Sequence, residues 1–267
     1  MGATPPGRPA IFITGAAAGI GRATAERFSR AGWFVGLYDI DEAGVQALAK
    51  TMPPAVAGRL DVTDTAGYAR ALETFFAAAG GRLDVLFNNA GIVTVGEFES
   101  VPLERHHAIV DVNLKGVING CHLALPYLKR TPGARVISMC SASALFGSPP
   151  FTVYGASKFA VRGFTEALNV EWARHGITVM DVLPLFVDTP MVRGFETAPR
   201  SMERLGLRLQ ADDIARTVWA ATQWPTRAWA WPRVHWLPGW QTWTLYLAAK
   251  LLPVWLNRLT TRLVTGY

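Results

Sequence analysis

The chain has 267 residues, which is near the upper limit for one hydrophobic core. No Ser/Gly tract, charge block or internal repeat divides it, so we expect a single domain over residues 1–267, with residues 1–8 as a flexible N-terminus. The net charge is +6, and residues 214–267 contain no Asp or Glu. Because the basic residues there are sparse and no nucleic-acid motif accompanies them, we do not expect a nucleic-acid partner.

The first residues contain neither an apolar signal region nor a myristoylation pattern, which indicates a cytoplasmic protein. Cys121 and Cys140 fall in apolar segments, and this favours buried reduced thiols over a disulfide. The five histidines show no metal-ligand spacing, so we predict no metal site.

Apolar runs alternate with amphipathic stretches along the chain, which predicts a doubly wound α/β fold with helices on both faces of a parallel sheet. Helices fill the intervals between the strands, and the longest are expected at 102–129 and 153–175. We expect seven strands, near residues 10–14, 33–38, 56–60, 83–88, 134–139, 178–183 and 233–236.

A glycine-rich turn follows the first expected strand. It reads Thr-Gly-Ala-Ala-Ala-Gly-Ile-Gly over residues 14–21, and a helix-like stretch comes after it. Glycines let the backbone approach a pyrophosphate, while free N–H groups and the positive end of the helix dipole receive its charge. This context favours a dinucleotide site over an ordinary strand-to-helix turn, and we assign to it Gly15, Ala18, Gly19, Ile20 and Gly21.

Tyr154 and Lys158 stand four residues apart in the run Tyr-Gly-Ala-Ser-Lys, with Ser141 thirteen residues before the tyrosine. On a helix this spacing puts phenol and ammonium on one face, with Cβ atoms about 5–6 Å apart. A fixed cation would lower the tyrosine pKa from its usual value near 10 toward the range useful for proton transfer. An exposed helix start that happens to carry both residues is the alternative.

Together these features resemble the short-chain dehydrogenase/reductase family, of the single-domain type. The motifs that carry the resemblance occur in the order of the family: the glycine turn at 14–21, Asn88-Asn89-Ala90-Gly91, Asn113, Ser141, and the pair Tyr154 and Lys158. The resemblance covers residues 10–189 and weakens toward the C-terminus. It implies a Rossmann-type fold, hydride transfer between nicotinamide and a hydrophobic secondary alcohol or ketone, and a homodimer or homotetramer packed through the long helices.

The resemblance also implies roles for four residues. Tyr154 is expected to be the acid or base, and Lys158 to lower its pKa and bind the nicotinamide ribose. Ser141 is expected to hold the substrate oxygen, and Asn113 to hold a water that relays protons. The structural alternatives are a helix cap for Ser141 and a turn or strand-end position for Asn113. The alternative function is a non-catalytic dinucleotide-binding scaffold or sensor.

Charge identifies the expected cofactor. Asp39 ends the second expected strand, eighteen residues beyond Gly21, where a carboxylate can accept hydrogen bonds from the adenosine ribose. A 2′-phosphate would be repelled there, and Ala18 and Ile40 occupy positions where NADP-dependent relatives often have Arg or Lys. We therefore predict NAD. Asp41 is interpreted as the start of the next helix.

The resemblance implies further cofactor contacts. Asp61 and Val62 are similar to the pair that holds the adenine ring. Leu185 stands where the family usually has glycine, and its side chain would narrow the nicotinamide pocket or require a different backbone. The remaining expected cofactor residues are Asn89, Ala90, Gly91, Pro184, Val187 and Thr189.

Two C-terminal segments are expected to differ with the substrate. Residues 190–209 resemble a mobile substrate lid, in which Phe195, Met202, Leu205 and Leu207 suggest an apolar ligand surface, with core packing as the alternative. Residues 238–267 form a basic, Trp-rich extension whose apolar run is too short to span a bilayer. We favour packing of its tryptophans against the pocket or another subunit, and peripheral contact with a membrane interface is the alternative.

Overall fold

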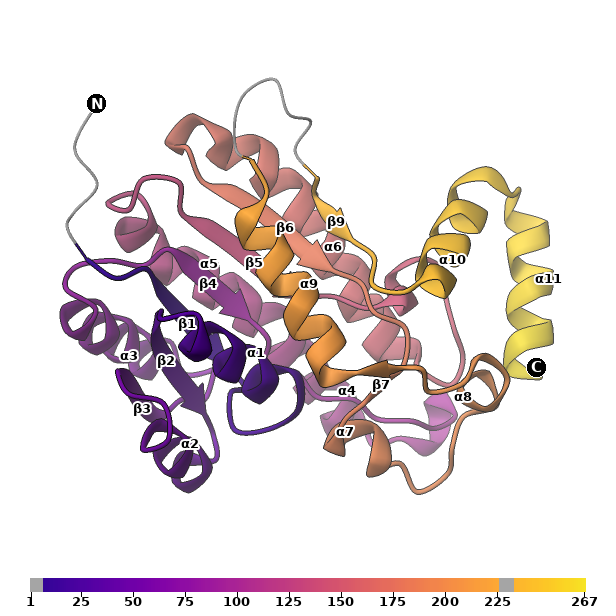
Figure 1. The fold of residues 1–267 in the computed structure, drawn as a ribbon. Helices are drawn as coiled ribbons and strands as arrows, with labels where there is room; N and C mark the ends of the chain where they lie inside the picture. Colours follow the sequence, from indigo (N-terminus) through magenta and orange to yellow (C-terminus); the bar gives the residue numbers. More distant parts are fainter. Residues whose placement is uncertain (1–6, 226–232) are drawn as a thin grey trace.

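The computed structural model describes residues 7–225 and 233–267, so most of the predicted flexible N-terminus lies outside the described residues (Figure 1). Seven parallel strands form one sheet in the order β3-β2-β1-β4-β5-β6-β9. The predicted doubly wound α/β class is therefore confirmed. The strands are β1 Ala10–Thr14, β2 Phe34–Asp39, β3 Ala55–Arg59, β4 Val85–Asn88, β5 Arg135–Met139, β6 Thr178–Val182 and β9 His235–Trp236.

The strand boundaries fall within two residues of those predicted. β4 begins at Val85 rather than at residue 83, because the Asp84 carboxylate takes the place of a backbone acceptor and binds the Ala10 N–H at 2.8 Å. β9 is also shorter than predicted, with only His235 and Trp236 paired to β6.

Helices cover both faces of the sheet. They are α1 Gly19–Arg30, α2 Glu42–Ala49, α3 Thr65–Ala78, α4 Leu103–Val110, α5 Gly116–Leu128, α6 Thr152–Trp172 and α9 Ala211–Gln223. Ile11 and Ile13 of β1 point into an apolar layer shared with α1, α2 and α9, whereas Phe12 points into the layer of α3, α5 and α6. Because side chains alternate along a strand, the central strands are apolar throughout.

The helix predicted over 102–129 is interrupted. A π-helical turn, Asp111–Lys115, joins α4 to α5 and contains Asn113. Such turns insert one extra residue into a helix and are frequent at functional sites. The helix predicted over 153–175 forms as α6, followed by the 3₁₀ turn Ala173–His175.

The segment predicted as a lid contains two short helices, α7 Pro190–Arg193 and α8 Arg200–Leu205. A two-stranded parallel pair that the sequence did not predict, β7 Val187–Asp188 with β8 Leu209–Gln210, joins its two ends. Arg193 adds a salt bridge to Asp188 at 2.6 Å. The two ends of the predicted lid are therefore held side by side, and α7 and α8 lie between them along the chain.

The C-terminal extension forms two further helices, α10 Trp240–Leu251 and α11 Val254–Thr265, separated at Pro253. They project beyond the end of the sheet, and α11 packs beside α8 (Figure 1). Arg162 of α6 lies over the Tyr246 ring of α10 at 5.7 Å. This contact ties the extension to the helix that carries Tyr154 and Lys158.

Candidate active site

The glycine turn joins β1 to α1 through two left-handed residues, Gly15 with φ 68° and Gly19 with φ 53°. A Cβ at Gly21 would lie 2.0 Å from the Gly15 oxygen, so only glycine lets the turn close. Gly15, Ala18, Gly19 and Ile20 line a cavity, as predicted for cofactor residues. Gly21 does not line it, and its contribution is the close packing of the helix on the turn.

Asn89 fastens the glycine turn from the end of β4. Its amide donates to the Thr14 and Gly15 oxygens, both at 2.9 Å. The Thr14 hydroxyl in turn accepts the N–H groups of Asn89 and Ala90, each at 3.0 Å. Asn89, Ala90 and Gly91 line the cavity. The structure thus gives the Asn89 amide a positioning role in addition to the predicted place beside the cofactor.

Asp39 ends β2 next to this turn. Its two carboxylate oxygens accept the N–H groups of Ala17 and Asp41, each at 3.0 Å. A carboxylate has further lone pairs, and both Asp39 and the exposed Ile40 line the cavity. Asp41 accepts the Gly44 N–H at 3.0 Å and caps α2, as its predicted place at the helix start requires.

Asp61 and Val62 follow β3 and also line the cavity. The backbone N–H and the hydroxyl of Thr63 donate to Asp61 at 2.9 and 2.7 Å, and these bonds lower the pKa of the carboxyl group. β2 and β3 are neighbours in the sheet, so Asp39 and Asp61 follow adjacent strand ends. This end of the cavity therefore carries two carboxylates, whose oxygens can accept hydrogen bonds from hydroxyl groups.

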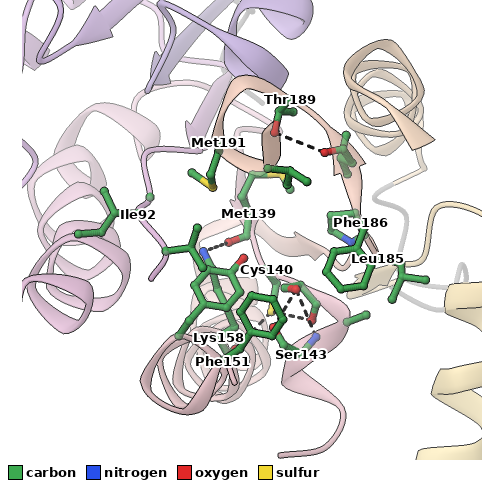
Figure 2. Close-up of a pocket in the computed structure, with 18 of the residues that line it drawn as sticks. Ile92, Met139, Cys140, Ser143, Phe151, Lys158, Leu185, Phe186, Thr189 and Met191 are labelled. Atoms are coloured by element: carbon green, nitrogen blue, oxygen red, sulfur yellow. Dashed lines mark hydrogen bonds between the residues drawn. The ribbon is translucent and has the colours of Figure 1, made fainter. Parts of the chain in front are cut away.

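Tyr154 and Lys158 lie one turn apart on α6, as their spacing predicted. The Lys158 Nζ is 5.6 Å from the Tyr154 ring centre and donates to the Met139 oxygen at 2.9 Å (Figure 2). Burial lowers the pKa of Lys158 to about 8. Burial also raises the pKa of Tyr154 to about 12, although a hydrogen bond with Ser141 opposes the shift. The predicted lowering of the tyrosine pKa by Lys158 is not found in this structure, because the ammonium is turned toward the end of β5.

Ser141 lies directly after β5 and faces the same cavity. Its Oγ accepts the Ser143 hydroxyl at 2.8 Å and the Ser143 N–H at 3.2 Å, so it also caps the short 3₁₀ turn Ala142–Ala144. Ser141 therefore forms the cap that the structural alternative predicted, and it also lines the cavity, where its role in holding the substrate oxygen stays a prediction. Ser143 lines the cavity too and was missed, since the Ser-Ala-Ser spacing is the only sign of it in the sequence.

Asn113 is buried in the π-helical turn and is not among the lining residues of the cavity. Its Oδ1 accepts the Ile92 N–H at 2.8 Å, while its Nδ2 donates to the Ile92 oxygen at 2.9 Å and to Ser157 Oγ at 3.3 Å. Asn113 therefore lies in a helical turn and not at a strand end. The amide clamps the loop after β4, which holds Gly91 next to Lys158.

The cavity that connects these groups has a volume of about 470 Å³. Pro184, Val187 and Thr189 line it as predicted. Past Ser141 its wall is aromatic, since the Phe151 ring lies 6.1 Å from Phe186 and 6.2 Å from Phe195 between ring centres. Figure 2 shows Phe151 and Phe186 beside each other in this wall. We call this aromatic-walled part of the cavity the chamber. An apolar molecule can extend into it from the end of the cavity at Tyr154.

The lid and the extension complete the chamber. Phe195 and Leu205 line it as predicted, whereas Met202 and Leu207 do not. The Ser201 hydroxyl on α8 is buried in the lining and has no hydrogen-bond partner among the described residues. The extension contributes lining residues from both of its helices: Leu245, Ala248, Asn257, Thr260, Thr261, Val264 and Thr265.

The prediction that the C-terminal tryptophans line the pocket is wrong for those in the described residues. Trp240, Trp243 and Trp255 are exposed, because α10 and α11 turn their smaller side chains toward the cavity. Trp236 belongs to the core, where it packs edge-on against Trp224 with 5.7 Å between ring centres. Trp219 packs on Phe28 and Trp33, and Trp229 and Trp231 lie outside the described residues.

Leu185, at the expected glycine position, lines the cavity and packs with Leu183, Leu237 and Leu245. Among the described residues, every residue with a positive φ is a glycine, so Leu185 is accommodated without left-handed backbone strain. It connects the floor of the pocket to α10.

A dinucleotide fits the residues present. The first turn of α1 has no acidic residue, and no side chain caps its N–H groups, so these groups and the helix dipole are open to a pyrophosphate. The glycine turn gives close backbone approach, and Asp39 supplies acceptors for a ribose. The site thus has the features of a nucleotide-binding α/β oxidoreductase, and Ser141, Tyr154 and Lys158 line the same cavity.

Comparison with known proteins agrees with this class. The short chain dehydrogenase family profile matches residues 9–199. A sulfoacetaldehyde reductase of Chromohalobacter salexigens is 32% identical over 88% of this chain and 96% of its own. A 3-oxoacyl-[acyl-carrier-protein] reductase of Thermotoga maritima is 35% identical over 67% and 74%. The solved structure of a short chain dehydrogenase/reductase from Burkholderia phymatum in complex with NAD superposes with a TM-score of 0.79, at 25% identity over 91% of this chain and 94% of that one.

The chain belongs to the short-chain dehydrogenase/reductase family. It is an oxidoreductase of that family, built on a Rossmann-type sheet, and its cofactor is a nicotinamide dinucleotide. Its fold and family were both predicted correctly from the sequence.

Proposed function

We propose that the protein is an NAD-dependent oxidoreductase that interconverts a hydrophobic secondary alcohol and the corresponding ketone. The observation that carries this proposal is the meeting of Ser141, Tyr154 and Lys158 with Asp39 in one cavity. A bound nicotinamide would accept or donate the hydride at the substrate carbon. The protein's own contribution is to hold the substrate oxygen and to move its proton.

Tyr154 is proposed as the proton donor and acceptor. With its pKa raised to about 12, it keeps its proton near neutral pH and can deliver that proton to a carbonyl oxygen during reduction. Oxidation needs the phenolate, which a rising pH favours. The Lys158 side chain would stabilise that phenolate only while it is an ammonium, below its pKa of about 8, and only after leaving the Met139 oxygen. Ser141, which accepts a hydrogen bond from Ser143, holds the substrate oxygen. Asn113 has a positioning role, because its amide is engaged with Ile92.

The lining of the chamber favours a substrate that is apolar and has a second hydrogen-bonding group besides the reacting oxygen. Phe151, Phe186, Phe195 and Leu185 form its wall near Ser141, so the carbon skeleton next to the reacting oxygen is expected to be hydrophobic. The unpartnered Ser201 hydroxyl in the lid would be left without a hydrogen bond by a wholly apolar ligand. A hydroxy or oxo compound with a further polar group fits this arrangement.

We propose NAD rather than NADP on the basis of Asp39. Its carboxylate lines the cavity next to the glycine turn, and neither Ala18 nor Ile40 can pair with a phosphate. Calorimetric titration with both nucleotides should show much tighter binding of NAD. The double variant Asp39→Ala/Ile40→Arg should shift the preference toward NADP, since repulsion is removed and a guanidinium is supplied.

Asp41→Ala is the matched control for this experiment, because Asp41 caps α2 and is not a lining residue of the cavity. It should leave the ratio of the two affinities unchanged. Equal affinity of the unmodified protein for NAD and NADP would refute the assignment of the cofactor.

We also propose that the protein forms a homodimer or homotetramer through the outer faces of α5 and α6. Ile118 of α5 and Phe159 and Val170 of α6 are exposed there, at 40%, 41% and 78%. Three large apolar side chains on two adjacent long helices are typical of a surface that another subunit covers.

A further inference from the structure

The helices α10 and α11 have two faces of different character. Their inner face lines the cavity through small and polar side chains such as Ala248, Thr260 and Thr261. Their outer face, which we define as Trp240, Trp243, Leu247, Leu251, Val254, Trp255, Leu259 and Leu263, is exposed in every one of these residues.

This outer face is the largest concentration of exposed apolar groups in the described part of the chain. Half of the large hydrophobic side chains that are exposed there lie between residues 240 and 267. Leu251 is 77% exposed and Val254 83%, and both flank Pro253 at the tip between the two helices. Monomeric proteins rarely expose large apolar patches to water, so we expect this face to be covered.

Charge indicates what covers it. Lys250, Arg258 and Arg262 are exposed on the same helices, and the sequence from residue 214 to 267 contains no Asp or Glu. A symmetric contact between two copies would bring these cations against the same cations of the second copy, with no carboxylate of this segment to neutralise them. A partner with an apolar interior and anionic groups at its boundary would bury the apolar residues and pair with the basic ones.

We infer that the outer face of α10 and α11 docks on a membrane surface that carries anionic lipid headgroups. Tryptophan and leucine enter the boundary between headgroups and acyl chains to a depth of about 5–10 Å, while Lys and Arg contact the headgroups. The contact is peripheral, since none of the helices in residues 7–225 and 233–267 has the length and hydropathy needed to cross a bilayer.

Docking would also place the chamber next to lipid, because the same two helices form its wall. An apolar substrate could then reach Tyr154 from the membrane without crossing water. Only this last consequence rests on the proposed function; the docking itself does not.

The test uses the full-length protein and two kinds of vesicle, phosphatidylcholine alone and phosphatidylcholine mixed with phosphatidylglycerol. Co-sedimentation should occur with the anionic vesicles, should be much weaker with the neutral ones, and should fall as salt is raised, because screening shortens the reach of surface charges. Blue-shifted tryptophan emission on binding would report that indoles leave water.

Two variants locate the contact. Lys250→Glu/Arg258→Glu and Leu259→Glu should each weaken binding to anionic vesicles at least about tenfold. Lys129→Glu/Arg105→Glu and Leu103→Glu are the matched controls, since these residues are exposed far from the extension in sequence, and they should bind as the unmodified protein does. Melting curves and turnover of a small soluble alcohol verify that each variant is folded.

Binding that is absent, equal for the two kinds of vesicle, or unaffected by both variants would overturn the inference. So would a dimer, seen by light scattering, that Leu259→Glu dissociates while vesicles bind neither protein, because a second copy would then cover the face. Vesicle binding needs no turnover, so its failure is distinct from failure of the proposed oxidoreductase activity.

Discussion

Burial of the Lys158 ammonium at this site reduces the stability of the folded protein. It lowers the pKa of this lysine to about 8, below the value of about 10.4 for an unfolded lysine. The folded state therefore binds this proton less tightly than the unfolded state, and the free energy of unfolding is reduced at every pH below about 8. As the pH rises from about 8 to about 10.4, the unfolded chain still holds the proton, and the penalty disappears.

We expect Lys158→Met to be more stable than the unmodified protein at pH 7, by about 3 kcal/mol at most, at about 1.4 kcal/mol per pKa unit. The difference should shrink toward zero near pH 10. Urea unfolding at both pH values measures it, and Lys129→Met, at an exposed lysine, should show no such pH dependence. Equal destabilisation by Lys158→Met at both pH values would contradict the assigned pKa.

Ser143 offers a second test at the scale of single residues. Its hydroxyl donates to Ser141 Oγ at 2.8 Å, and one such hydrogen bond contributes about 1 kcal/mol. Ser143→Ala should therefore lower turnover about fivefold to tenfold and leave the affinity for NAD unchanged. Ser143→Thr keeps a hydroxyl and should restore most of the rate. Full activity in Ser143→Ala would show that Ser141 acts without this partner.

At the scale of elements, the turn between β1 and α1 depends on one close contact. A Cβ at residue 21 would lie 2.0 Å from the Gly15 oxygen. Gly21→Ala should displace the turn, weaken NAD binding at least about tenfold and cost roughly 1–3 kcal/mol of stability. Calorimetric titration and thermal melting measure the two effects.

Gly163→Ala is the matched control within α6, since a Cβ there meets no atom within 4 Å. Alanine at this position, on the face of α6 where Phe159 and Val170 are also exposed, should leave NAD affinity as it is. A Gly21→Ala protein that binds NAD normally would mean that the turn does not form the cofactor cradle.

The elements that sequence predicted well are those with a local signature. Apolar runs bounded by turn residues placed all seven strands, and four-residue spacing placed Tyr154 and Lys158 on one helix face. The π-helical turn at Asn113 could not be predicted, because it is stabilised by a contact with Ile92, twenty-one residues away. The pair of β7 and β8 likewise depends on two-residue strands that are far apart in the chain.

At the scale of the whole molecule, the sequence predicted the site more fully than its surroundings. Every predicted cofactor residue except Gly21 lines the cavity, because the order of motifs fixes which strand ends meet. The charge state of Lys158 and the direction of the C-terminal tryptophans depend on tertiary packing. Composition alone therefore predicted indoles in the pocket, whereas the fold turns Thr and Ala inward and leaves indoles exposed.

The whole account depends on Tyr154 as the group that moves the proton during hydride transfer. The most direct measurement is the absorbance of NADH during turnover of a panel of hydrophobic secondary alcohols and ketones, by the unmodified protein and by Tyr154→Phe. The unmodified protein should reduce ketones near neutral pH and oxidise alcohols faster as the pH rises, since the pKa of Tyr154 is raised to about 12.

Tyr154→Phe should bind NAD almost unchanged and lose at least about a hundredfold in turnover, as expected when a positioned acid is removed. Near-normal turnover by Tyr154→Phe at saturating substrate would contradict the proposed proton transfer. Tight NAD binding by the unmodified protein, with no turnover of any member of the panel, would instead favour a dinucleotide-binding scaffold.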